Sequence, residues 1–191
     1  MINRCQWANS SEWLKKYHDE EWGGKPFHND QKLFEMLILE GKSCGLSWEL
    51  ILKKRDHMKK VFDNFDPEIL IKYDEIKIQS LMSDAGIIRN KLKISAVIEN
   101  AKAYLRLKER QTFDDFLWKY VNYEPIVNDG SQRIARNKIS DRLSKDLKKS
   151  GFKFVGSIII YSFMQAIGMV NDHENMCFCK FRSPQSHNIK N

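Results

Sequence analysis

The sequence predicts an all-α fold, a compact bundle of roughly eight helices, from three observations. The 191 residues include only nine glycines and four prolines, whereas all-β proteins need many tight turns and usually more of both. Apolar residues recur at helical spacing along most of the chain. No two neighbouring segments show the alternation of apolar and polar residues that a strand pair requires.

Helix start signals divide the first half of the chain. Asp30 is expected to cap a helix that runs through Glu40, and a second helix should span about 47–62. Asp66 followed by Pro67 marks the start of a short helix. A long helix is expected over about 88–109, where the apolar residues follow a period of about 3.6: Ile94, Val97, Ile98, Ala101 and Leu105.

The second half contains a long polar interruption. Thr112 should cap a helix that reaches about Val121, and residues 122–138 are expected to form a surface loop. Helices should follow over about 140–149 and 157–169, joined by a glycine-bounded turn at 151–156. We expect a single domain over residues 1–181 and a disordered tail over 182–191.

The charge balance limits the class of partner. Lys and Arg total 32 against 25 Asp and Glu, a formal net charge of +7. This balance is compatible with nucleic acid, with an anionic membrane surface, or with no partner. No apolar stretch reaches the length of about 20 residues that a membrane span needs, and the N-terminus lacks a signal-peptide core. We therefore expect a cytoplasmic protein, in which the four cysteines are thiols, metal ligands or core residues.

Metal-ligating side chains lie near both chain ends. Cys5 and His18 fall in the first 18 residues, and His173 and Cys177 are four residues apart, so one helical face could present both. Two thiolates and two imidazoles suit a tetrahedral, structural zinc. The alternative is two buried free thiols and two surface histidines. Cys179 is a competing ligand two residues further on.

Glu40 lies on the apolar face of its predicted helix, above Met36 and Leu37. A carboxyl group in such a position is paired, protonated or functional, although most glutamates are simply exposed. Trp48 follows a stretch loosened by glycines and could form one wall of a flat pocket, with Glu40 as a hydrogen-bond acceptor. Cys44, in an apolar helical context, is expected in the core.

Four aromatic residues crowd the N-terminus and a basic turn lies near the C-terminus. Trp7, Trp13, Tyr17 and Trp22 either fill a small core or stack on a planar ligand such as a nucleobase. The turn at 151–156 is flanked by lysines, including Lys149 and Lys153, and opens a helix with free backbone N–H groups. Such a turn suits phosphate binding, although lysine runs are more often solvated faces.

These segments together resemble the DNA-3-methyladenine glycosylase I (Tag) family. The resemblance runs in order from about Arg4 to Cys179, and is carried by RCQW, YHDEEWG, LFEMLILEGKSCGLSW, LKKR, DAGIIRNKLKI, LSKDLKKSGFKFVG and YSFMQAIGMVNDH. It implies an all-α helix-hairpin-helix glycosylase fold whose two chain ends, about 1–25 and 170–180, are joined by one structural zinc. It also implies a monomeric enzyme that removes 3-methyladenine from alkylated double-stranded DNA and leaves an abasic site.

The resemblance assigns roles by position. Implied zinc ligands are Cys5, His18, His173 and Cys177. The implied base pocket contains Glu40 as catalytic residue with Tyr17, Trp48 and Trp7 as substrate-binding residues. Implied DNA contacts are Leu46, which would fill the gap left by a flipped nucleotide, and the hairpin with Lys149, Gly151, Lys153 and Gly156. No lysine stands where a Schiff-base nucleophile would be needed, so lyase activity is not expected.

Three features depart from the family pattern or from its superfamily. Leu14 stands where relatives often carry a second tyrosine, and the loop 122–138 differs from theirs, so no residue in it is assigned a role. Helix-hairpin-helix glycosylases usually carry a catalytic Asp after the hairpin. The first acid there is Asp172, which adjoins His173 and is not assigned that role.

Two other hypotheses about function remain. The second hypothesis is a zinc-pinned DNA-binding module without catalysis. The third is a globular core whose excess positive charge lies only on its surface and serves no partner.

Overall fold

A computed structural model describes residues 2–23 and 26–181. The predicted disordered tail, 182–191, lies outside the described residues. Within the described ranges the chain is mostly helical, as predicted, and no helix is long and apolar enough to cross a membrane.

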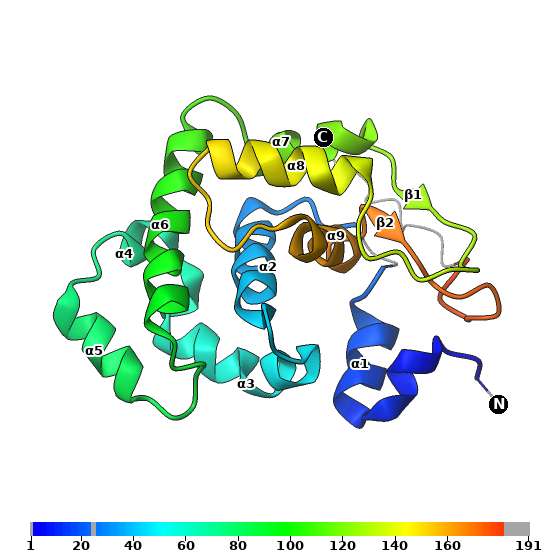
Figure 1. The fold of residues 1–191 in the computed structure, drawn as a ribbon, viewed down its shortest axis with the longest axis horizontal. Helices are drawn as coiled ribbons and strands as arrows, with labels where there is room; N and C mark the ends of the chain where they lie inside the picture. The colour runs from blue at the N-terminus through cyan, green and yellow to red at the C-terminus, as the bar shows by residue number, and fades with distance from the viewer. Residues whose placement is uncertain (1, 24–25, 182–191) are drawn as a thin grey trace, which may run out of the picture.

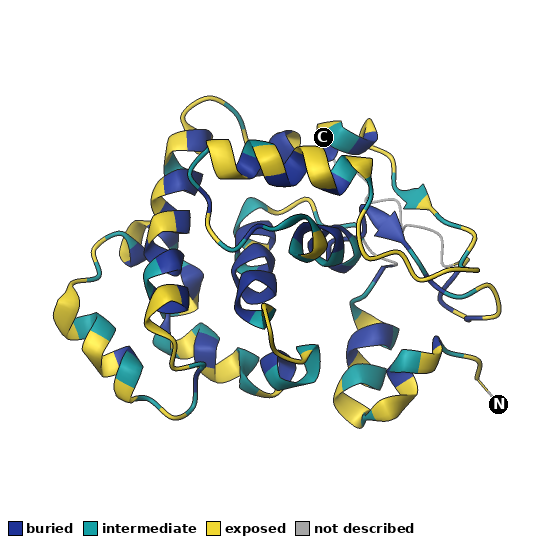
Figure 2. Cartoon of the chain, viewed as in Figure 1, coloured by how far each residue is buried: buried dark blue, intermediate teal, exposed yellow. Residues whose placement is uncertain are grey.

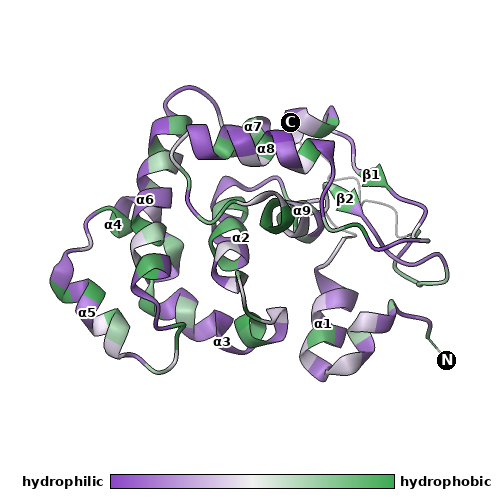
Figure 3. Ribbon diagram, viewed as in Figure 1, coloured by the Kyte–Doolittle hydropathy of each residue, from purple (hydrophilic) through white to green (hydrophobic). Residues whose placement is uncertain are grey.

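The helix α2 (Asp30–Ser43) occupies the centre of the fold (Figure 1). It is surrounded by the helices that contact it: α3 (Trp48–Val61), α6 (Lys91–Lys108), α7 (Phe113–Trp118) and α9 (Ser157–Ala166). Figure 2 shows α2 buried along most of its length, and the buried run extends from Met36 to Lys42. The apolar side chains of these helices form one large core, with green segments on α2 and α9 in Figure 3.

The remaining elements lie around this centre. The first helical segments are η1 (Gln6–Ser10) and α1 (Glu12–Glu20). Shorter elements follow α3, namely η2 (Asp63–Phe65), α4 (Pro67–Leu70) and α5 (Glu75–Ser83). The C-terminal half adds η3 (Lys119–Val121) and α8 (Lys138–Lys149).

Three of the predicted helix starts are confirmed by cap hydrogen bonds. The side chains of Ser47, Asp66 and Thr112 each accept a backbone N–H at the start of α3, α4 and α7. The predicted cap of α2 is wrong by one residue. Asn29 caps α2, whereas the Asp30 carboxylate accepts the backbone N–H groups of residues 113 and 114 and so joins α2 to α7.

Two short strands were not expected from the sequence. The strand β1 (Ile126–Val127) pairs in parallel with β2 (Val170–Asn171), and Ile126 faces Val170. Two residues per strand are too few to show an alternating pattern, so the pair leaves no local signal. Its consequence is that the loop 122–138 is held against the segment that follows α9.

The turn at 151–156 joins α8 to α9 as a hairpin. Its glycine at Gly151 adopts a left-handed φ of +97°, and Phe154 adopts φ +55°. The hairpin is fixed on both sides: Ser144 Oγ donates to the carbonyl of Val155 at 2.6 Å, and the backbone N–H of Lys153 donates to Asn100 Oδ1 at 2.6 Å. The predicted helix-hairpin-helix element is therefore present.

Candidate functional site

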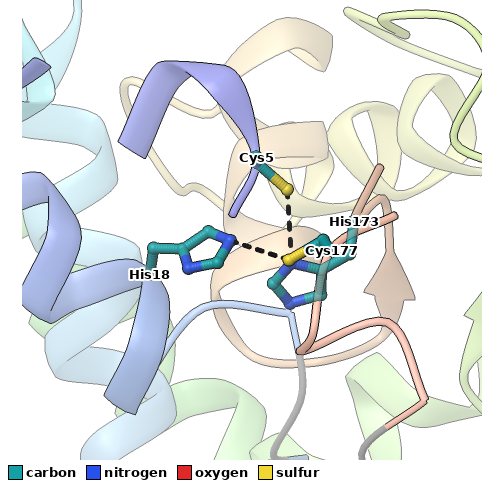
Figure 4. A group of neighbouring side chains, drawn as sticks. All are labelled: Cys5, His18, His173 and Cys177. Atoms are coloured by element: carbon teal, nitrogen blue, oxygen red, sulfur yellow. Dashed lines mark hydrogen bonds between the residues drawn. The ribbon is translucent and has the colours of Figure 1, made fainter. Parts of the chain in front are cut away.

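Two cysteine and two histidine side chains from the two chain ends, all of types that can bind a metal ion, lie close together (Figure 4). Cys177 Sγ lies 3.3 Å from His18 Nε2 and 3.5 Å from His173 Nδ1. The Sγ atom of Cys5 lies 3.5 Å from the same His173 nitrogen. All four donor atoms lie within 4.8 Å of one another, and all four residues are buried. The expectation of two surface histidines is thereby excluded.

The donor set and its spacing fit a tetrahedral metal ion. Zinc binds thiolate sulfur at about 2.3 Å and imidazole nitrogen at about 2.0–2.1 Å, so a tetrahedron places S and N about 3.5 Å apart. The observed S···N distances match this value. Burial raises the pKa of the Cys5 thiol to about 12, so a thiolate there needs a neighbouring cation. The four residues could therefore bind one metal ion.

In each imidazole of this cluster, the ring nitrogen that faces away from the cysteines has a polar contact that fixes the orientation of the ring. His18 Nδ1 lies 2.8 Å from Asp19 Oδ1, and the Arg4 guanidinium in turn binds the Asp19 carboxylate at 2.8 Å. His173 Nε2 lies 3.1 Å from the carbonyl of Trp22. Such contacts hold each ring with its other nitrogen toward the cluster, as in the carboxylate–histidine–metal arrangements of zinc proteins.

The two remaining cysteines differ in their positions. Cys179 is buried beside the cluster, where its backbone N–H donates to Cys177 Sγ at 3.4 Å. The prediction that Cys44 belongs to the core is wrong, because its side chain is exposed. The chain ends α2 at Ser43 and turns away at Cys44, so the helical pattern that suggested burial stops one residue earlier.

A cavity of about 850 Å³ adjoins the cluster. Among its lining residues are the four that the sequence predicts for a base pocket: Glu40, Tyr17, Trp48 and Trp7. Leu46 also lines it. The volume of the cavity lies within the range of about 300–1,000 Å³ that is usual for small-molecule pockets.

Glu40 is the buried carboxyl group of this cavity. It belongs to the last turn of α2, and only 4% of its surface is exposed. Burial raises its pKa from 4.5 to about 8, and no neighbouring charge offsets the shift. The next residue, Gly41, lies against the hairpin, where an added Cβ would come 3.3 Å from Phe154 Cβ. The end of α2 therefore contacts both the cavity and the hairpin.

Aromatic rings form a continuous chain along the cavity. The Tyr17 ring centroid lies 5.4 Å from that of Trp48 and 6.5 Å from that of Trp7. Trp7 in turn meets Trp22 edge to face at 5.0 Å. Burial is the main cause that holds the pKa of Tyr17 well above its usual value, so the phenol stays neutral. Trp7 and Trp22 pack against the cysteine cluster and also line the cavity, whereas Trp13, the remaining aromatic residue of the predicted N-terminal group, is 48% exposed and is not part of the lining.

The predicted DNA contacts do not all line the cavity. Leu46 is 39% exposed at its edge, directly after Gly45, which has φ +74°. The hairpin residues lie outside the lining. Gly156, the N-cap of α9, carries no side-chain cap and has open space where a Cβ would point. Lys153 is exposed, and Lys149 lies 3.6 Å from Asp146.

The structure adds lining residues that the sequence did not predict. Residues 130–135 of the loop 122–138 border the cavity, together with Ser162 and Gln165 of α9. Asp172, which also borders it, accepts hydrogen bonds from Asn128 Nδ2, Tyr161 OH and Gln165 Nε2. These contacts join the residues that directly follow β1 and β2 to α9, and no sequence motif predicts them.

Comparisons with known proteins agree with this arrangement. Residues 7–180 match the methyladenine glycosylase family. The DNA-3-methyladenine glycosylase of Haemophilus influenzae is 44% identical over 184 residues, which cover 94% of this chain and 99% of the relative. DNA-3-methyladenine glycosylase 1 of Escherichia coli is 46% identical over 93% of this chain and 97% of its own length.

A solved structure carries the same fold. The crystal structure of a 3-methyladenine DNA glycosylase I (TAG) superposes with a TM-score of 0.89 at 43% identity, and the match covers 93% of this chain and 99% of that one. Both the fold and nearly the full length of the sequence are thus shared with proteins of one kind. The chain belongs to the methyladenine glycosylase family.

Proposed function

We propose that this enzyme removes 3-methyladenine from alkylated double-stranded DNA by hydrolysis of the N-glycosidic bond, leaving an abasic site without strand cleavage. The observation that carries the proposal is Glu40, a buried carboxyl group in a cavity lined by aromatic rings. Family membership supports the same activity, since the relatives are named for it.

Hydrolysis of this glycosidic bond requires little acid catalysis from the protein. Alkylation at N3 makes the adenine ring cationic, so the base departs as a neutral molecule once the glycosidic bond breaks. Protonation of the leaving group, which normal adenine requires, is therefore unnecessary. The protein must select the cationic base, withdraw it from the duplex and admit water to the sugar carbon.

Glu40 selects the cationic base over neutral adenine. Its raised pKa reflects burial alone, so a cation that enters the cavity stabilises the carboxylate and lowers that pKa again. The carboxylate then accepts a hydrogen bond from the exocyclic amine of the base. Tyr17, Trp48 and Trp7 present ring faces and edges to the same base, and a cationic ring gains a further cation–π attraction. Neutral adenine obtains neither electrostatic contribution.

DNA binding combines the hairpin and Leu46. Gly156 leaves the N-terminal amides of α9 accessible, and with Lys149, Gly151 and Lys153 it would bind backbone phosphates. Leu46 would occupy the gap in the stack that the flipped nucleotide leaves. Flipping costs a few kcal/mol, less for a damaged base, and these contacts offset part of that cost.

The metal would be one structural zinc held by Cys5, His18, His173 and Cys177. Four protein ligands leave no open position, so the ion supplies folding energy and no chemistry. It would join the ends 1–25 and 170–180 of a single glycosylase domain over residues 1–181. The proposal also places a monomer in the cytoplasm, where thiol ligands stay reduced.

A base-release assay tests the activity. Duplex DNA treated with a methylating agent is incubated with the wild type, with Glu40→Gln, and with Glu99→Gln, a control for an exposed glutamate paired with Lys102 on α6. We expect the wild type and Glu99→Gln to release 3-methyladenine alike, and Glu40→Gln to lose at least about tenfold in rate. No release by the wild type would reduce the protein to a DNA-binding module.

The same reactions test the absence of lyase activity. Products are separated on a denaturing gel before and after alkali treatment. Strands should break only after alkali, because an abasic site is alkali-labile and the enzyme leaves it intact. Nicks that form with enzyme alone would contradict the monofunctional part of the proposal.

A further inference from the structure

We infer that the tip of the loop 122–138 is a second DNA-contacting element, in which Arg133 binds a backbone phosphate beside the flipped nucleotide and Ile134 packs against the bases at the gap. The inference rests on the proposed function, because it takes alkylated duplex DNA as the ligand. It adds to the hairpin and Leu46 a contact from a different part of the chain.

The first observation is where the loop lies. Residues 130–135 line the same cavity as Glu40 and Leu46, so a nucleotide that enters this cavity lies close to the loop. Figure 1 shows the loop alongside the segment that follows β2. A base that leaves the duplex for this cavity therefore brings its own phosphates within reach of the loop.

The second observation is that the start of the loop is anchored. The β1–β2 pair holds residues 126–127, and the Asn128 backbone N–H donates to the carbonyl of Asn171 at 3.1 Å. The Asn128 side chain donates to Asp172, and Lys180 Nζ donates to the Asn128 carbonyl. Gly130 then packs so closely that an added Cβ would lie 2.4 Å from the carbonyl oxygen of His173.

The end of the loop is anchored as well. Asn137 caps α8 in a reciprocal capping box with Ser140, whose hydroxyl lies 2.9 Å from that of Ser157. Residues 131–136 between the two anchors are all exposed. A tip fixed at both ends presents its side chains to a ligand with little loss of conformational entropy.

The third observation is the composition of the tip. Arg133 and Arg136 are exposed, and among the described residues no carboxylate oxygen lies within 4.0 Å of either guanidinium. Ile134 stands between them with 37% of its surface exposed. Asp129, the acidic residue of the loop nearer to the tip, accepts hydrogen bonds from the backbone N–H and the hydroxyl of Ser131. Proteins that bind kinked duplexes combine arginines, which contact the DNA groove, with apolar side chains that insert between base steps.

Salt-dependent binding tests the Arg133 contact. The probe is a duplex with a tetrahydrofuran abasic analogue, and affinity is measured by fluorescence anisotropy across a salt series. One lost phosphate contact lowers the slope of log K against log salt by about 0.9. We expect that change for Arg133→Gln. Lys72→Gln, which removes one exposed charge between α4 and α5, should leave the slope unchanged.

Ile134 is tested with the same probe and an undamaged duplex. Ile134→Ser should weaken binding to the tetrahydrofuran duplex about tenfold, the effect of one lost apolar contact, and leave binding to the undamaged duplex unchanged. Ile76→Ser, which changes an 80% exposed isoleucine of α5, is the matched control. Equal effects of Ile134→Ser on both duplexes, or an Arg133→Gln slope equal to that of Lys72→Gln, would overturn the inference.

The outcome is separable from that of the proposed function. Base release by the wild type with no effect of Arg133→Gln on binding would refute the loop contact and leave the glycosylase intact. Binding that depends on Arg133, in a protein that releases no base, would refute the activity and retain the loop.

Discussion

The Nζ atom of Lys42 lies 4.3 Å from the centroid of the Phe62 ring, and within the described part of the chain no hydrogen-bond partner reaches it. Only 2% of the Lys42 surface is exposed, because α2 is enclosed on all sides at this point. Burial, with a smaller contribution from the nearby Lys93 ammonium, lowers the pKa of Lys42 to about 7. The cation–π contact offsets only part of the cost of burying this amine.

Lys42→Met should therefore stabilise the protein. In the folded state the pKa is about 7 against an ordinary 10.5, so between these values the unfolded chain binds a proton that the folded chain does not. Stability consequently rises with pH through this window, and below pH 7 the penalty is present in full. We expect a gain of about 2–4 kcal/mol at pH 7 that shrinks toward pH 10.

Chemical denaturation at pH 7 and pH 10 measures the gain. Lys60→Met, at an exposed position on α3, should change the free energy of unfolding by no more than about 0.5 kcal/mol. A Lys42→Met variant that is less stable than the wild type at pH 7 would mean that the amine has a compensating partner.

Glu40 should govern the pH dependence of base release. Its pKa of about 8 in the free protein means that roughly one tenth of the molecules carry the carboxylate at pH 7. Because kcat/KM reports the ionisation of the free enzyme, it should rise with pH up to about 8 and then level off. The rise should be absent from the residual activity of Glu40→Gln.

The measurement is base release at limiting substrate between pH 6 and 9, with spontaneous release subtracted at each pH. Glu99→Gln, which keeps Glu40, should reproduce the wild-type profile. A flat wild-type profile, or the same rise in Glu40→Gln, would assign the pH dependence to another group.

Asp19 should strengthen metal binding through His18. Its carboxylate lies 2.8 Å from His18 Nδ1 and is bound by the Arg4 guanidinium. Burial alone would raise the pKa of Asp19, but the hydrogen bonds from Arg4 and His18 hold this pKa below its usual value. Loss of such an orienting contact typically weakens metal binding about 10–100-fold. Asp19→Asn should therefore release zinc to a chelator at lower chelator concentration.

A surface pair provides the control. His28 Nδ1 lies 3.0 Å from Asp114 Oδ1, an Asp–His contact of the same kind on an exposed ring away from the cysteines. Asp114→Asn should leave zinc retention unchanged. About one zinc per chain is expected in the wild type, and metal analysis that finds none in an intact fold would rule out the structural metal.

Sequence reasoning succeeded where the signal was local. The apolar face of α2, the caps at Ser47, Asp66 and Thr112, and the glycine-bounded hairpin follow from neighbouring residues, and the structure contains each of them. It failed where tertiary contacts decide. Cys44 was expected in the core from its apolar neighbours, but α2 ends at Ser43 and the chain leaves Cys44 exposed.

The candidate site shows the same difference between features with a local sequence signal and features that depend on tertiary contacts. The metal-ligand residue types are visible in the sequence, but only the fold brings together side chains from the two ends, whose S···N separations are near 3.5 Å. The loop that borders the cavity has no periodicity and no motif. Its place depends on the β1–β2 pair and on one close backbone approach at Gly130, both long-range contacts that leave no local pattern.

Alanine substitutions at Gly130 and Gly45 distinguish a local backbone constraint from a long-range packing constraint in one experiment. Both adopt left-handed φ, +73° and +74°, so alanine at either position costs about 1–2 kcal/mol of backbone strain. At Gly45 a Cβ would meet no atom within 4 Å, whereas at Gly130 it would lie 2.4 Å from the carbonyl oxygen of His173. Gly130→Ala must therefore displace the loop or the segment that carries His173 and Cys177, two of the candidate metal ligands.

We expect Gly45→Ala to cost about 1–2 kcal/mol and Gly130→Ala to cost about 3 kcal/mol or more, measured by chemical denaturation of the metal-loaded protein. The excess at Gly130 measures the close packing of the loop against residues 173–175, since the two positions share the same backbone conformation. Equal costs for the two variants would show that the loop yields freely. A loop that moves so easily could not hold Arg133 beside the cavity.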